Sequence, residues 1–138
     1  MDIKGVVIKP LKQIPDERGK VMHMLRRDDP DFEQFGEIYF SIVLPAKIKA
    51  WYRNKKTTVN YAVVEGNIKL VIYDGNESQI IHIGEDNYCL ITIPPGLWRG
   101  FQAVGGKKAI VADLTDFQYD SADIEKAEIN DFINCWEG

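Results

Sequence analysis

The sequence is poor in the residue types that build metal centres and disulfide frameworks. Its 138 residues include two histidines and two cysteines. Cys89 and Cys135 lie far apart in the chain, so the pattern predicts neither a zinc site nor a set of disulfides. His23 and His82 are also isolated from each other. We therefore expect no tightly bound transition metal.

The chain also lacks long apolar runs and an excess of basic residues. Its longest apolar stretches, such as 62–64 and 70–72, are far shorter than the roughly 18 residues of a membrane span. The start Met1-Asp2 does not resemble a signal peptide. A formal net charge of −4 argues against a general nucleic-acid-binding surface. The sequence thus predicts a cytoplasmic protein with reduced cysteines, without a membrane or nucleic-acid partner.

The common templates of nucleophilic and phosphate-binding sites are missing as well. There is no glycine-rich loop ahead of a helix, no G-x-S-x-G turn and no recognisable arrangement of cysteine with histidine. Nucleophilic catalysis is therefore not expected.

What the sequence does contain is a series of short β-branched and aromatic runs separated by turn residues. Apolar residues alternate in 37–43 and in 67–73, as they do in half-buried strands, and we expect both apolar faces to contribute to a common core. This pattern predicts one all-β domain over 1–138, a sandwich or small barrel. The expected strands are 5–8, 20–25, 37–44, 48–53, 61–64, 67–73, 79–83, 88–93 and 108–114.

Two segments, 28–35 and 121–132, lack the strand pattern. In the second segment Ser121 is a candidate N-cap, and Ile124, Ala127 and Ile129 follow an imperfect helical period. The sequence therefore predicts at most one short helix near the C-terminus.

Three segments, 16–19, 48–53 and 94–101, are candidates for a binding site: the last two combine aromatic and basic residues, and the first contributes Arg18. In 48–53, strict alternation places Lys49, Trp51 and Arg53 on one face and Tyr52 on the other. Because cations bind phosphate and flat rings stack on a base or sugar, such a face suits a nucleotide-linked ligand. The alternative is a solvent-exposed edge strand with extended basic side chains.

These segments resemble, in order, the motifs of the cupin-fold nucleotide-sugar epimerases typified by dTDP-4-dehydrorhamnose 3,5-epimerase. The D-x-R-G motif appears as Asp16–Gly19, and R-A-W-H-R resembles Lys49–Arg53. The I-P-x-G-x-x-H-G-F motif resembles Ile93–Phe101. The resemblance continues through a hairpin at 63–74, a tyrosine at Tyr119 and an acidic segment that closes on Trp136.

The resemblance implies a cupin jelly roll, also called a double-stranded β-helix, that forms a homodimer. It assigns Arg18 and Lys49 to the diphosphate and makes Tyr119 the catalytic acid, whereas Tyr52 stands where the family has its histidine base. A second family histidine is replaced by Arg99. We expect one pocket at the barrel mouth. Because alternation separates Tyr52 from Lys49, this requires a β-bulge or twist near Ala50, or Tyr52 supplied from a different depth. The expected lining residues of the pocket are Arg18, Lys49, Trp51, Tyr52, Arg53, Trp98, Arg99 and Tyr119.

The implied function is epimerisation or ketone isomerisation of a nucleotide-linked 4-keto-6-deoxysugar in deoxysugar biosynthesis, without metal or redox cofactor. Tyrosine is a weak candidate for the base, because its pKa is about 10 against about 6.5 for histidine. Three alternatives remain open. The pocket performs a different isomerisation, with Tyr119 or a carboxylate as the proton carrier. The chain is a degenerate cupin that binds a sugar nucleotide or a protein partner without turnover, or its aromatic and basic residues only pack a dimer interface. The identity of the nucleotide and sugar, and the number of inverted carbons, also stay open.

Overall fold

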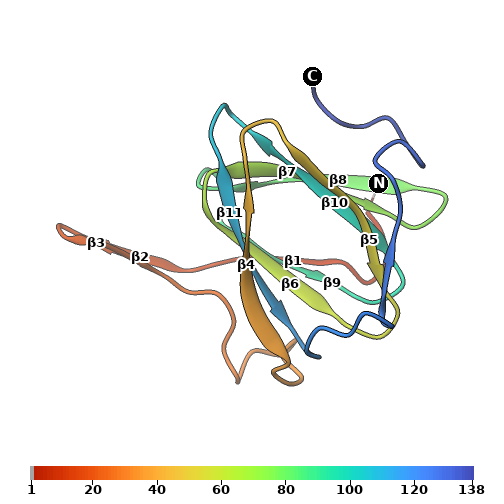
Figure 1. Ribbon diagram of the computed structural model, residues 1–138. Helices are drawn as coiled ribbons and strands as arrows, with labels where there is room; N and C mark the ends of the chain where they lie inside the picture. The colour runs from red at the N-terminus through yellow and green to blue at the C-terminus, as the bar shows by residue number, and fades with distance from the viewer. Residues whose placement is uncertain (1) are drawn as a thin grey trace.

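The chain forms two five-stranded antiparallel sheets that face each other, as the computed structural model of residues 2–138 shows (Figure 1). The first sheet consists of β1 (Val7–Pro10), β4 (Glu37–Val43), β6 (Val59–Glu65), β9 (Cys89–Ile93) and β11 (Ala109–Thr115). The second consists of β5 (Ile48–Asn54), β7 (Asn67–Tyr73), β8 (Ser78–Gly84), β10 (Trp98–Val104) and β12 (Ile124–Lys126). Their strand orders are β1-β9-β6-β11-β4 and β12-β5-β10-β7-β8. The all-β prediction is confirmed.

The core lies between the sheets and is built by alternation along the strands. Ile68, Leu70 and Ile72 of β7 point inward and are fully buried, together with Ile91 of β9. Burial of each such side chain stabilises the fold by about 1.5–3 kcal/mol. The expectation that 67–73 contributes an apolar face to the core is confirmed.

The same expectation for 37–43 is wrong. Ile38, Phe40 and Ile42 lie on the outer face of β4, where Phe40 is 61% exposed. The inner face of this strand carries Val43 and, nearer its start, Tyr39. Alternation identifies the two faces of a strand, but it does not say which one turns toward the core.

Two other sequence expectations need correction. The expected strands do not include β10 (Trp98–Val104), a central strand that begins within the 94–101 segment and pairs with both β5 and β7. A Cβ at Gly100 of this strand would collide with Ala50 of β5, so glycine permits the close approach of the two backbones. Residues 124–126, where a helix was allowed, form β12 because their backbone pairs with the edge of β5.

Two peripheral segments extend beyond the sheets. The hairpin of β2 (Gln13–Asp16) and β3 (Gly19–Met22) projects away from the sandwich in Figure 1. The chain after β12 runs along the outer face of the second sheet, where the Trp51 indole donates to the Ile129 carbonyl. Residues 2–138 contain no helix, and therefore none long and apolar enough to cross a membrane.

Candidate active site

A β-bulge in β5 decides which side chains enter the space between the sheets. Arg99 of β10 pairs with Tyr52, but Phe101 pairs with Lys49, so two steps along β10 match three along β5. The extra residue reverses the alternation between the two partners. Lys49 and Tyr52 consequently share the inner side, and the bulge expected near position 50 is confirmed.

Two cationic side chains reach from the second sheet toward the first. The Arg99 side chain lies between the sheets and is only 5% exposed. Its Nε donates a 2.6 Å hydrogen bond to the Tyr61 hydroxyl of β6. Lys49 Nζ donates a 2.9 Å hydrogen bond to Ser41 Oγ of β4. Burial raises the pKa of Tyr61 to about 12, so this tyrosine is a neutral phenol beside the guanidinium.

Facing these cations is an acidic residue that the sequence reasoning missed. Asp113 of β11 is 1% exposed, and burial raises its pKa to about 6 although the Tyr39 hydroxyl and Arg99 oppose the shift. Burial and the neighbouring Asp113 also raise the pKa of Tyr39. The sequence pattern indicates that Asp113 points inward, because Asp113 continues the alternation of the inward residues Ala109 and Val111.

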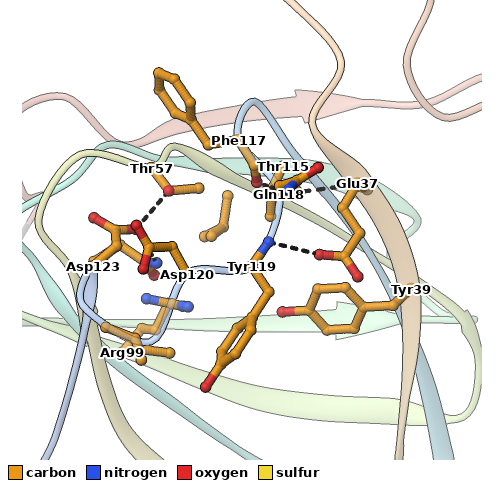
Figure 2. A pocket seen from close by; sticks show the side chains of 13 residues that line it. Glu37, Tyr39, Thr57, Arg99, Thr115, Phe117, Gln118, Tyr119, Asp120 and Asp123 are labelled. Atoms are coloured by element: carbon orange, nitrogen blue, oxygen red, sulfur yellow. Dashed lines mark hydrogen bonds between the residues drawn. The ribbon is translucent and has the colours of Figure 1, made fainter.

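The pocket at this end of the barrel is bordered by residues from both sheets and from the segment after β11. Figure 2 shows the Tyr39, Arg99 and Tyr119 side chains around one space. The Tyr119 N–H donates a 2.9 Å hydrogen bond to Glu37 Oε1, which ties the 116–120 segment to the start of β4. The Tyr119 side chain itself is 66% exposed and lies at the mouth.

The wall opposite Glu37 is fixed by Asp123. Its carboxylate accepts hydrogen bonds from the Thr57 hydroxyl at 2.6 Å and from the Lys56 N–H at 2.7 Å (Figure 2). It also accepts from the Asn54 amide at 2.9 Å. These contacts lower the pKa of Asp123 against the effect of its burial, so the group stays ionised and holds the 54–57 loop at the pocket edge.

The eight site residues expected from the sequence fall into three groups. Lys49, Tyr52 and Arg99 are in the barrel interior, and Tyr119 is at its mouth. Arg18 is on the projecting hairpin. The remaining three, Trp51, Arg53 and Trp98, lie on the outer face of the second sheet.

The expected single pocket therefore needs correction for the outer three residues. Trp51 is 0% exposed and packs against Phe132 and Trp136 at ring-centroid distances of 5.6 and 5.2 Å. The Arg53 guanidinium lies 4.4 Å from the centre of the Trp98 ring. The bulge turns Trp51 and Arg53 outward, to the face that also carries Trp98 of β10, and this face holds the C-terminal segment.

The comparison with known proteins identifies the family. The model of the WxcM-like, C-terminal family (FdtA) matches residues 4–136. The chain belongs to the WxcM-like family. Its fold matches the crystal structure of a dTDP sugar isomerase from Desulfovibrio desulfuricans G20 with a TM-score of 0.91 and 43% identity, over 94% of this chain and 87% of that one. The predicted cupin jelly roll is confirmed by this match.

Two curated proteins are also similar to this WxcM-like chain. The probable low-salt glycan biosynthesis epimerase Agl13 of Haloferax volcanii is 28% identical over 137 residues, which cover 93% of this chain and 88% of Agl13. The spore coat polysaccharide biosynthesis protein SpsL of Bacillus subtilis is 29% identical over 124 residues, which cover 85% of this chain and 82% of SpsL. These comparisons thus support the resemblance to sugar epimerases and isomerases that the sequence motifs indicated.

Proposed function

We propose that this protein isomerises or epimerises a dTDP-linked 4-keto-6-deoxysugar during the biosynthesis of a glycan or polysaccharide. The observation that carries the proposal is the 43% identity to a dTDP sugar isomerase over almost the whole chain. The likeness to Agl13 and SpsL, which are named for glycan and polysaccharide biosynthesis, supports the pathway class. The free thiols of Cys89 and Cys135 fit a reducing cytoplasm, where we place the reaction.

The chemistry of such a reaction fits the polar end of the barrel. Inverting a carbon next to a ketone, or moving the ketone to the neighbouring carbon, begins with removal of the proton on that carbon. Acid and base groups are sufficient for this step, so we propose that neither a metal nor a redox cofactor takes part. Lys49 and Arg99 supply positive charge that stabilises the enolate formed when the proton leaves.

We propose Tyr52 and Tyr119 as residues that contact the sugar. By motif register, Tyr52 stands where the related epimerases have their histidine base, and Arg99 stands at a second histidine position. Tyr52 points inward beside Arg99, whereas Tyr119 reaches the pocket from its mouth (Figure 2). The two hydroxyl-bearing side chains come from different elements, β5 and the segment after β11.

We also propose a homodimer, in which Arg18 binds the diphosphate in the partner's site. Ile38, Phe40 and Ile42 form an exposed apolar row on the outer face of the first sheet. Ile14 of the projecting hairpin is exposed as well. Pairing two copies through these surfaces buries the apolar residues and carries Arg18 toward a second pocket.

A second candidate function is sugar-nucleotide binding without turnover. The observation that favours it is Tyr52 itself, because an ordinary phenol is neutral at pH 7 and removes a carbon-bound proton poorly. The positive charge of Lys49 and Arg99 between the sheets fits both candidates.

The deciding experiment is solvent-deuterium exchange with dTDP-4-keto-6-deoxyglucose, followed by NMR and by dTDP binding measured calorimetrically. We expect deuterium at the carbon next to the ketone together with a new isomer, both unaffected by a metal chelator. Binding without exchange selects the non-catalytic candidate. Neither binding nor exchange across a panel of dTDP-, UDP- and GDP-linked keto sugars refutes both.

A further inference from the structure

The pocket needs a base stronger than a neutral phenol, and neither histidine lies in it. His82 is exposed on β8, and His23 follows β3 at the base of the hairpin, where its carbonyl accepts from the Tyr88 hydroxyl. A base that removes a proton next to a ketone works best when its pKa lies near the working pH. The candidate groups are therefore the acidic residues that face the interior.

Asp113 is the carboxyl group most completely enclosed between the sheets among the residues described, with 1% exposure. It is faced by Tyr39 and Glu37 from β4, by Tyr61 from β6 and by Arg99 from β10. Its Oδ1 atom has no hydrogen-bond partner among residues 2–138. An unpartnered oxygen in a buried carboxyl group destabilises the fold, and such a cost is typical of sites where the group has a chemical task.

Tyr39 connects this buried carboxyl group to the pocket. Tyr39 lies directly opposite Asp113 in the pairing of β4 with β11, and its side chain is 42% exposed. In Figure 2 the Tyr39 hydroxyl points into the space bordered by Arg99 and Tyr119. A proton can therefore pass between a bound sugar and Asp113 through one intervening hydroxyl group.

We propose that Asp113 accepts the substrate proton through Tyr39. The C–H bond next to the ketone breaks, and its proton bonds to Tyr39 Oη while the original Tyr39 O–H proton moves to Asp113. The electron pair of the C–H bond moves onto the ketone oxygen, which becomes an enolate. The reverse transfer returns a proton to carbon. Tyr39 is the catalytic residue, and Asp113 is the positioning residue that holds its proton.

Charge and burial favour this direction of transfer. Burial raises the pKa of Asp113 to about 6, so at pH 7 the group is ionised yet more basic than a surface aspartate. Negative charge then moves from Asp113 to the enolate inside a site that already contains Arg99. The inference rests on the proposed function and gives the base role to Asp113 and Tyr39. The Tyr52 hydroxyl is then available to donate a hydrogen bond to the ketone oxygen.

The test is the rate of deuterium exchange into the keto sugar from about pH 5 to about pH 8.5, for the wild type and four variants. We expect the wild-type rate to rise with pH and to level off above about pH 6. Asp113→Asn and Tyr39→Phe should each slow exchange about 100-fold or more and abolish this inflection, with the Kd for dTDP changed less than about twofold. Tyr52→Phe should slow exchange and keep the inflection.

Asp116→Asn is the matched control, because Asp116 is another buried aspartate near the end of β11 but bonds to the Thr58 N–H away from Tyr39. It should retain both the rate and the inflection. A folded Asp113→Asn or Tyr39→Phe protein that exchanges within about threefold of the wild-type rate overturns the inference. If Asp113→Asn does not fold, Tyr39→Phe decides, since Tyr39 is half exposed. Absence of exchange in the wild type refutes the proposed function, and the inference falls with it.

Discussion

Replacement of Trp51 tests whether this residue holds the fold together or binds ligand. Trp51 is fully buried under the C-terminal segment, and its Nε1 donates a 3.1 Å hydrogen bond to the Ile129 carbonyl. Removing a buried aromatic side chain typically costs about 3–5 kcal/mol, and a lost hydrogen bond adds about 1 kcal/mol. We therefore expect Trp51→Ala to lower the free energy of unfolding by about 4–6 kcal/mol. Trp51→Phe retains most of the packing and should cost about 1–2 kcal/mol.

The measurement is urea denaturation followed by far-ultraviolet circular dichroism, combined with calorimetric titration of dTDP. Because the indole lies outside the barrel, folded Trp51→Phe should bind dTDP with a Kd within about twofold of the wild type. Phe35→Ala provides the control for stability, since Phe35 is exposed and its loss should change the unfolding free energy by less than about 0.5 kcal/mol.

The opposite pair of results would refute this reasoning. If Trp51→Phe leaves the urea midpoint unchanged but weakens dTDP binding about tenfold, Trp51 stacks on the nucleotide as the sequence pattern suggested. The C-terminal segment would then have to leave the outer face of the second sheet when ligand binds.

Four further predictions address proton transfer, diphosphate binding, dimerisation and pH. Tyr119→Phe should still allow deuterium exchange but abolish formation of the inverted sugar, which NMR of the product measures. The reason is that the proton still leaves the carbon next to the ketone, but no acid returns a proton to the opposite face of the sugar. Arg18→Ala should raise KM more than it lowers kcat in steady-state assays, since a diphosphate contact is made equally in the ground and transition states. Phe40→Lys should give a monomer in light scattering by placing charge in the apolar row. Asp113 has a folded-state pKa of about 6 against the ordinary 3.8, so its contribution to stability is present below about pH 4 and is lost as the pH rises through 6. Asp113→Asn should accordingly gain up to about 3 kcal/mol relative to wild type between pH 4 and pH 7.5 in urea denaturation.

The sequence predicted the strands whose patterns are local and missed those whose partners are distant. Alternation in 67–73 is visible because β7 is a regular strand with one apolar face. β10 was not recognised because Arg99 and Gln102 interrupt its apolar pattern. Both side chains are buried, and each is satisfied by a partner far away in the chain, such as Tyr61 for Arg99. Polarity in a strand is therefore compatible with burial when tertiary contacts supply the hydrogen bonds.

The candidate site was only partly predictable for a related reason. The motifs located Lys49, Tyr52 and Arg99, and the need for a bulge followed from requiring the first two on one side. The outward turn of Trp51 could not be derived, because aromatic residues in a motif suit a binding face and a packed face equally. Only the position of the C-terminal segment, which packs on the indole, distinguishes the two.

The placement of Asp113 shows how one strand contributes to both the core and the pocket. Along β11 the inward positions are Ala109, Val111, Asp113 and Thr115, so the strand passes from apolar to polar in the direction of the pocket. β4 runs antiparallel beside it and brings Tyr39 opposite Asp113 in register. Alternation thus delivers a carboxyl group and a hydroxyl group to the same depth, because the pairing of these two strands is regular throughout. The rigid sheet fixes their separation, and the apolar residues below them exclude the water that would otherwise keep the pKa of Asp113 in its ordinary range.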